Sequence, residues 1–365
     1  MNSLYCELMR YKIFEVSFIR AIVASLVILT YGCTTPMVTD NASESAGNDT
    51  TAVLSNSIAI MPFDNLSADP ENAYFAMGIH KDLIYKLSLI QDVGVISHNG
   101  IFELDNDEVM HANYPSDISV AEFASKLNVG TVMKGRVRLT NDRVNIAVQL
   151  LDASGGNVLW REIYELDIAD IFTVQSKIIE NVVAALGANI TAAEKARIET
   201  PLTSSTDAYK LYLKANLVVA HLEAGMSAEF YENIDHAIEI DPDFAHAHAI
   251  RATGTGLAHT FGNRLRLPSL DDVDKLTVAH VEKALSLDPN DPFAHMGQAL
   301  SHYSHGRKEE GRQAYERALA LGPNLVEVLN GYSHFLSYYG DDDKAILLAR
   351  RAQVLTPNIA NWHAR

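Results

Sequence analysis

Residues 287–323 read LDPNDPFAHMGQALSHYSHGRKEEGRQAYERALALGP, and their spacing decides the fold of the carboxy-terminal half. Two prolines, Pro289 and Pro323, stand 34 residues apart in this stretch. Between them, small residues fall where two packed helices need close contact, a glycine falls where a turn is needed, and apolar residues follow it: Ala299, Gly306, Tyr315, Ala318 and Leu319. The stretch therefore predicts a pair of helices that recurs along the chain.

The same pattern continues in both directions. Proline recurs at Pro357, 34 residues after Pro323, and stands at Pro242, 47 residues before Pro289. A 34-residue period resembles the tetratricopeptide repeat (TPR) family. The resemblance implies an all-α TPR helical solenoid over residues 207–365, with the last repeat incomplete, and the longer interval predicts an extended loop around 263–272.

Stacked first helices of such repeats form a groove, and its wall can be named from the spacing. Aromatic, apolar and small polar side chains at these positions suit an extended peptide or a helix from a partner protein. We expect seven residues to point into it: Phe293, Met296, Leu300, Tyr303, Asn330, His334 and Ser337. For each residue alone, the alternative is an incidental position on the groove wall.

A mixed domain precedes the repeats. The apolar run from Ser57 to Phe63 ends at a proline-containing turn and predicts a buried strand. Apolar residues spaced by three and four predict helices over 69–90 and 171–186, and Ser119 with Glu122 predicts a capped helix ending at Leu127. Strands are expected at 93–97, 131–139, 143–151 and 157–164, the middle two joined by a turn at 140–142.

Several separated blocks of this domain resemble the TolB-like amino-terminal domain of bacterial envelope and regulatory proteins. These blocks include Pro62-Phe63-Asp64-Asn65-Leu66-Ser67, Tyr74-Phe75-Ala76-Met77-Gly78-Ile79, Gln149-Leu150-Leu151-Asp152-Ala153 and Asp170-Ile171-Phe172-Thr173-Val174-Gln175. The resemblance covers residues 57–190 and implies an α+β fold, a mixed sheet with flanking helices, in a module without catalytic activity. Residues 191–206 are expected to be a linker.

One basic cluster stands out in an acidic chain. Lys134, Arg136 and Arg138 alternate along one predicted strand, and Arg143 lies just across the turn. The cluster predicts either a solvated sheet face, partly paired with acidic neighbours such as Glu162, or a surface for an acidic partner.

The amino terminus has the features of a targeting segment. Basic residues precede the apolar run from Ala21 to Tyr31, which is too short for a membrane-spanning helix but suits a signal peptide. The residues before Cys33 resemble a bacterial lipoprotein box, which implies cleavage after residue 32 and lipid attachment at Cys33. Residues 33–56 are then a polar, disordered tether. The alternative is an uncleaved signal anchor in the inner membrane.

The net charge and the catalytic motifs of the sequence limit the classes of function that we expect. The 29 basic and 46 acidic residues give a net charge of −17, which opposes unselective binding to nucleic acid. The sequence has none of the common motifs of zinc hydrolases, serine hydrolases or P-loop nucleotide-binding proteins, so we expect no enzyme activity, cofactor, metal or small-molecule substrate.

Two functions remain. The first is a non-enzymatic envelope protein, lipid-anchored and facing the periplasm, with the outer membrane favoured, whose repeats bind a protein partner. The second is the regulatory portion of a signalling protein, of a cyclase-associated or CadC-like type, that lacks its effector domain.

Overall fold

The computed structural model of the chain describes residues 56–96, 102–104, 110–112, 118–218, 228–260 and 270–357. The chain divides into two compact units, Met1–Asp49 and Thr50–Arg365, and all described residues belong to the second. The predicted signal peptide, Cys33 and nearly all of the predicted tether lie outside the described residues, as does most of the loop expected around 263–272.

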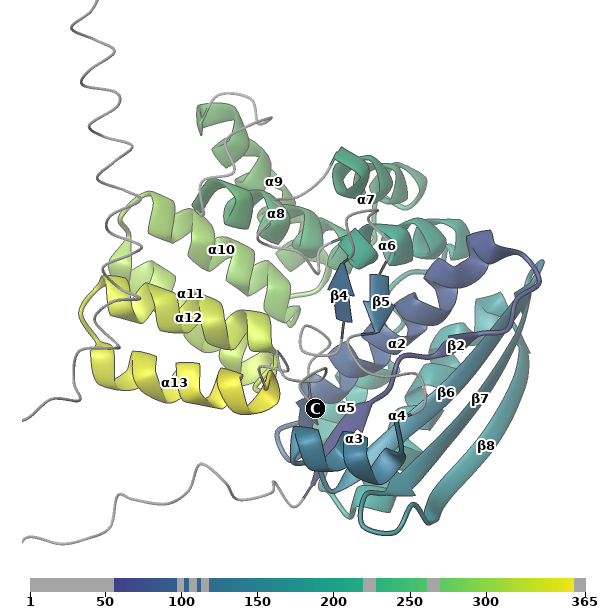
Figure 1. Cartoon of the computed structure of the whole chain (residues 1–365). Coiled ribbons are helices and arrows are strands. Elements are labelled where there is room, and N and C mark those ends of the chain that lie inside the picture. Colours follow the sequence, from purple (N-terminus) through teal and green to yellow (C-terminus); the bar gives the residue numbers. More distant parts are fainter. Residues whose placement is uncertain are drawn as a thin grey trace, which may run out of the picture. The chain divides into compact units, whose positions relative to one another are not determined.

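A six-stranded mixed sheet forms the amino-terminal part of the second unit (Figure 1). Its main path runs β3-β1-β6-β7-β8, with β2 beside β6. The strands are β1 (Ser57–Ile60), β2 (Asp64–Asn65), β3 (Gly94–Ile96), β6 (Thr131–Thr140), β7 (Arg143–Asp152) and β8 (Val158–Asp167). A separate two-stranded sheet joins β4 (Phe102–Leu104) to β5 (Met110–Ala112).

The register of the long hairpin follows from its turn and its alternation. Thr140 pairs with Arg143, so only Asn141 and Asp142 form the loop, and Asn141 takes the left-handed conformation, with φ of 54°, that such turns favour. Along β7, buried Val144, Ile146 and Val148 alternate with more exposed residues. The expected strands and turn are confirmed.

Helices cover most of one face of the sheet and a smaller part of the other. α2 (Ala73–Ser88) and α4 (Ile171–Leu186) bury their apolar faces against the inner side chains of β1, β6 and β7. α3 (Val120–Leu127) covers the opposite face where β3, β1 and the start of β6 meet. Ser119 accepts a hydrogen bond from the amide of Glu122, which confirms the predicted cap of α3. The outer face of β7 and β8 has no such cover among the described helices.

The segment expected as a linker contains a helix. α5 (Ala192–Glu199) begins with a capping box in which the side chains of Thr191 and Glu194 each bond the other's backbone amide. Ile198 of α5 is buried, and Gln91 donates its backbone N–H to the Glu194 carboxylate. α5 is therefore packed against the sheet domain, which corrects the expectation that residues 191–206 form only a linker.

Four helix pairs follow the sheet domain (Figure 1). Within the described residues the pairs are α6 (Thr206–Val218) with α7 (Ala228–Ile240), α8 (Ala245–Thr260) with α9 (Leu270–Leu287), α10 (Pro292–Ser304) with α11 (Lys308–Leu321), and α12 (Val326–Tyr338) with α13 (Asp342–Leu355). The last two pairs start 34 residues apart, and each has a glycine with positive φ between its helices, at Gly306 and Gly340. The predicted repeat is confirmed.

The helix pairs pack on the sheet domain through their first helices. The Nζ atom of Lys81, on α2, donates to the carbonyl of Asn216, on α6, over 2.6 Å. Leu89, just after α2, is buried in the apolar core of the last two pairs. The Asn324 side chain, before α12, donates to the carbonyl oxygens of Ile90 and Val93 over 2.7 and 2.9 Å. α2 and its following loop thus lie along these first helices.

The described part of the chain holds no helix that is both long and apolar enough to cross a membrane.

Candidate functional site

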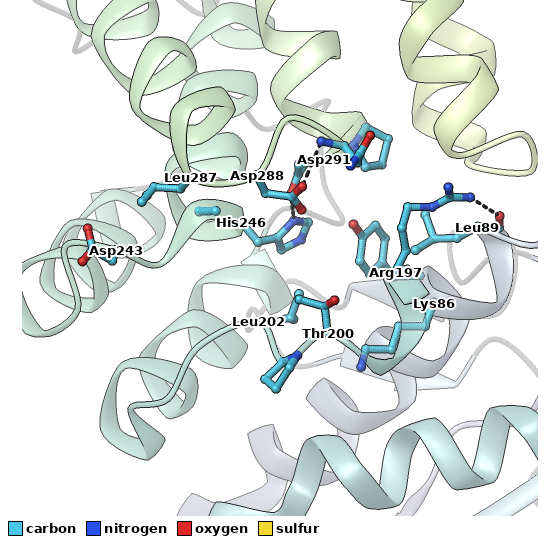
Figure 2. Close-up of a pocket in the computed structure, with 15 residues that line it drawn as sticks. Lys86, Leu89, Arg197, Thr200, Leu202, Asp243, His246, Leu287, Asp288 and Asp291 are labelled. Carbon is cyan, nitrogen blue, oxygen red and sulfur yellow. Dashed lines mark hydrogen bonds and ion pairs between the residues drawn. The ribbon is translucent and has the colours of Figure 1, made fainter. Parts of the chain in front are cut away.

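A pocket opens where the sheet domain meets the helix pairs (Figure 2). Its volume is about 280 Å³, and its lining comes from the end of α2, the segment after α5, and the loops that precede α8 and α10. In Figure 2, His246 and Asp291 lie on one side of the pocket, and Arg197 and Lys86 lie on the other. The lining residues are spread along the sequence from Tyr85 to Pro292, so no local motif could predict this pocket.

A buried ion pair forms the acidic side of the pocket. The Nδ1 atom of His246 lies 2.5 Å from Oδ2 of Asp291, and both side chains are almost fully buried. The other carboxylate oxygen of Asp291 accepts the backbone amides of Phe293 and Ala294 and so caps α10. Burial alone would lower the pKa of His246, but the Asp291 charge and hydrogen bond outweigh it and raise that pKa.

A buried lysine lies on the opposite side. The Nζ atom of Lys86 donates to the carbonyl of Ile198 over 3.2 Å, and burial lowers the pKa of Lys86 to about 8. Asp82, one turn earlier on α2, is buried as well, and burial raises its pKa. Its carboxylate accepts hydrogen bonds from the hydroxyls of Tyr209 and Tyr212 on α6. These polar groups are paired with one another and fasten α2 to the helix pairs.

The arrangement offers no catalytic constellation among the described residues. Asp291 is already engaged by His246 and by the α10 amides, and Lys86 by a carbonyl. No group of three or more histidine, cysteine or acidic side chains within the described ranges is placed to hold a metal ion. In the pocket lining, the buried Nε atom of Arg197 has no hydrogen-bond partner.

The structure separates the seven predicted groove residues into two groups. Met296 and Leu300 are buried in the apolar core shared by α10, α11 and α12, which corrects the expectation that they face an open groove. The first helices approach closely at this point, and a side chain at Gly331 would meet the end of Met296. Phe293 is half-buried, with its ring 5.8 Å from the ring of Tyr85 on α2.

The remaining four lie more openly: Tyr303, His334 and Ser337 near the ends of α10 and α12, and Asn330 one turn before His334 on α12. Tyr303 is half-buried, whereas Asn330, His334 and Ser337 are exposed. The ring of Tyr303 lies 6.1 Å from that of His334 and 5.0 Å from that of Tyr338, a residue the sequence analysis had not selected. Tyr338 is 67% exposed. We call Tyr303, His334, Ser337 and Tyr338 the aromatic patch.

The basic cluster lies on the sheet as expected. Lys134, Arg136 and Arg138 alternate on the outer face of β6, and Arg136 and Arg138 are exposed. Arg143 pairs with Asp167 across β7 and β8 at 3.1 Å. Glu162 does not neutralise the cluster, because it faces the inner side opposite Val148 and accepts the hydroxyl of Tyr164. Whether an acidic partner binds these four residues stays a prediction.

Acidic side chains gather at the start of α13. Asp342 and Asp343 lie in its first turn, near the positive end of the helix. The side chain of Asp341, which precedes α13, makes no cap hydrogen bond and instead binds Arg312 of α11 at 3.0 Å. The side chain thus joins two helices of neighbouring pairs.

Comparison with known proteins gives one curated relative and several distant structural likenesses. No protein-family profile matches the chain. A Rhizobium meliloti (strain 1021) protein named "Putative adenylate cyclase 3" is 32% identical over 246 residues, which are 67% of this chain and 40% of that protein. The chain therefore spans about two fifths of the length of the curated relative it matches.

Solved structures resemble separate parts of the chain. TolB from Acinetobacter baumannii is 18% identical over 36% of this chain and 28% of its own, with a TM-score of 0.26. A thermophilic TPR protein from Thermus thermophilus is 12% identical over 52% of this chain and 86% of its own, with a TM-score of 0.35. At these scores the likenesses are distant, and the fold rests on the strand order and helix pairs of this chain itself.

Proposed function

We propose that this protein is a non-enzymatic interaction protein, tethered to the cell envelope, whose helix pairs bind a protein partner through the aromatic patch. The observation that carries the proposal is the gathering of Tyr303, His334 and Tyr338 on an exposed surface at the ends of α10 and α12. Exposed aromatic side chains of this kind supply much of the binding energy at protein interfaces.

The rest of the first-helix surface supports this choice of region. α2 and the loop after it cover the beginnings of α10 and α12, through Leu89 and through the hydrogen bonds of Asn324. A partner therefore meets the ends of these helices, where the exposed Ser337 supplies a polar group, with Asn330 exposed one turn before His334 on α12. A polar rim around aromatic residues is typical of a protein interface.

A photo-crosslinking amino acid at Tyr338 tests the proposal in the cells that produce the protein. Leu347, on α13, is 66% exposed and provides a matched control position. We expect one partner band from position 338 that is absent from position 347 and that fades when Tyr303→Ala and His334→Ala are added. Equal labelling at both positions, or labelling insensitive to these changes, would contradict the proposal.

Envelope tethering is the second element of the proposal and has its own test. The sequence around Cys33 supports cleavage and lipid attachment there, on the periplasmic side, with an inner-membrane signal anchor as the alternative. Mass spectrometry of the mature full chain should show loss of residues 1–32 and added lipid mass, both absent from Cys33→Ser. An intact, unmodified amino terminus would support the anchor instead.

A second candidate function has a specific observation in its favour. The curated relative bears the name of an adenylate cyclase, and this chain matches only 40% of it. The chain would then be the regulatory portion of a signalling protein and would act on a separate effector domain. We propose that the chain itself has no cyclase activity. Incubation of the purified chain with ATP and Mg²⁺ or Mn²⁺ should yield no cyclic AMP, and its formation would overturn the non-enzymatic assignment.

A further inference from the structure

Strand β8 is an uncovered edge of the main sheet. Among the described strands it pairs with β7 alone, although it is ten residues long (Figure 1). Three large apolar side chains lie open on it, with Val158 53%, Leu159 48% and Ile163 63% exposed. A long, apolar edge strand presents unpaired backbone groups and is a template for another strand.

The hydrogen-bond pattern shows which backbone groups face outward. Ile168 donates its N–H to the carbonyl of Asp142 over 2.8 Å, and the pairing of β7 with β8 continues this register. Antiparallel pairs alternate between bonded and non-bonded, so Leu166, Tyr164 and Glu162 direct their backbone groups toward β7. The N–H and C=O groups of Glu165, Ile163 and Arg161 must therefore point to the free edge.

The side chains of the same three residues share the outer face of the sheet. They lie opposite Asn145, Ala147 and Gln149 of β7. Arg161 and Glu165 stand two positions to either side of Ile163, so the strand carries opposite charges symmetrically about an apolar centre. Such an arrangement is complementary to itself when the strand direction is reversed.

We propose that β8 pairs antiparallel with β8 of a second copy of this chain, with Ile163 opposite its symmetry mate. In this register Arg161 of each copy lies opposite Glu165 of the other, twice per interface. On the inner face, Trp160 meets Leu166 and Glu162 meets Tyr164. The main sheets of the two copies become one continuous sheet, and the β8 edge of each copy is then paired.

Neighbouring registers are worse by the same reasoning. A pairing centred on Glu162 places that carboxylate against its own symmetry mate, and one centred on Tyr164 places Ile163 against Glu165. A pairing centred on Arg161 sets two like charges face to face. Like charges directly opposite each other destabilise a strand pair. Among these registers, only the pairing about Ile163 sets Ile163 against its symmetry mate and Arg161 against Glu165, and in it Leu159 falls opposite Asp167.

The surrounding charge permits this contact in an acidic protein. The net charge of −17 repels a second copy at long range, but salt screens that repulsion beyond about 8 Å at physiological ionic strength. On the same outer face of the sheet, β6 carries the cations Lys134, Arg136 and Arg138, which offset nearby carboxylates. The pairing uses neither the aromatic patch nor the pocket, so it stands independently of the proposed function.

Charge reversal tests the register. Sedimentation velocity of the detergent-solubilised full chain should show a concentration-dependent dimer. Arg161→Glu or Glu165→Arg alone sets two pairs of like charges opposite each other and should weaken dimerisation about tenfold or more. The double variant Arg161→Glu/Glu165→Arg restores both opposite-charge pairs and should recover dimerisation to within about threefold of the unaltered chain.

A cysteine placed on the symmetry axis gives a second readout. In a Cys6→Ser/Cys33→Ser background, Ile163→Cys puts two thiols in a backbone-bonded pair, whose Cα atoms lie about 5.5 Å apart, within disulfide range. Val158→Cys is the control, because it is similarly exposed yet lies about 33 Å from its symmetry mate at five residues from the axis. We expect a covalent dimer from position 163 and none from position 158.

Four results would overturn the proposal. A chain that remains monomeric at all concentrations excludes the pairing, and equal crosslinking at positions 163 and 158 excludes the register. A dimer unaffected by either single reversal shows that copies associate elsewhere, for example through the amino-terminal apolar segment. A double variant as weak as the single ones would show that Arg161 and Glu165 do not face each other across the contact between copies.

Discussion

The first helices of the repeats and strand β8 both carry rows of apolar side chains, yet only the helices are covered. Leu89 and the loop after α2 fill the beginnings of α10 and α12, and Asn324 closes this contact with two hydrogen bonds to backbone carbonyls. Leu159 and Ile163 of β8 lie open. The chain thus fills part of its own groove, whereas β8 has no second partner strand among the residues that the structure describes, so residue type alone does not identify the free surface.

The largest expected difference in the free energy of unfolding is between two leucine variants, one beside the first helices and one on strand β8. Leu89→Ala should lower the free energy of unfolding by about 3 kcal/mol, because it removes buried contacts and leaves a cavity. Leu159→Ala, at the open edge, should change it by less than about 0.5 kcal/mol. Chemical denaturation of both variants measures the difference, and similar losses would mean that the two leucines are equally buried.

The next largest effect on the free energy of unfolding concerns the hydrogen bonds of Asn324 to the loop after α2. Asn324→Ala leaves the carbonyl oxygens of Ile90 and Val93 buried without their donor and should cost about 2 kcal/mol. Asn330→Ala is the control on the same helix pair, since this side chain is exposed and should be nearly neutral. A neutral Asn324 variant in denaturation would show that water replaces the lost amide.

The free energy of unfolding should also depend on pH, through Lys81 of α2 at its contact with α6. Burial lowers the pKa of Lys81 to about 7 in the folded chain, against the opposing charge of Glu327, from an ordinary value of 10.5. Between these two values the unfolded chain binds a proton that the folded chain lacks. The free energy of unfolding should therefore rise with pH from about 7 to 10, by at most about 1.4 kcal/mol per unit.

Lys81→Met should remove the share of this rise that Lys81 contributes and leave the share of Lys86, whose pKa burial lowers to about 8, whereas the exposed Lys214→Met should keep the whole rise. Urea titrations at several pH values measure the slope. An unchanged slope in the Lys81 variant would assign the pH dependence to another group.

The smallest expected difference in stability is between two arginine variants, one from each region. Arg351 donates to the side-chain oxygen of Asn324 over 2.8 Å and holds that amide in place, so Arg351→Ala should cost about 1 kcal/mol. Arg143 pairs with Asp167 at the exposed sheet, and Arg143→Ala should fall within about 0.5 kcal/mol of the unaltered chain. Thermal melts of the two variants would distinguish them, and the reverse order would place the stabilising contact at the sheet.

Much of the fold could be predicted because the relevant signals are local. Turn residues and alternation specify the register of the β6-β7 hairpin, and the recurrence of Gly306 and Gly340 marks the last two helix pairs. The residues that line the groove could be predicted less well. Spacing placed Met296 on a first helix but could not show that α12 and Tyr315 close over it.

The candidate site could be predicted still less well, because it depends on contacts between residues far apart in the sequence. Tyr338 was missed because its importance lies in its position beside Tyr303, 35 residues earlier. The pocket between Lys86 and Asp291 has no sequence signature, since its two sides meet only after the helix pairs pack on α2.

Sequence patterns alone missed β2, β4, β5 and α5. They specified β1, β3, β6, β7 and β8, the helix pairs, the β6-β7 turn and the cap of α3. These features depend on a residue's near neighbours, through backbone sterics, side-chain periodicity and short-range hydrogen bonds. The tertiary structure decided which surfaces are covered. That outcome depends on contacts such as Asn324 with Ile90, 234 residues apart, whose burial follows from the packing of whole elements rather than from any local pattern.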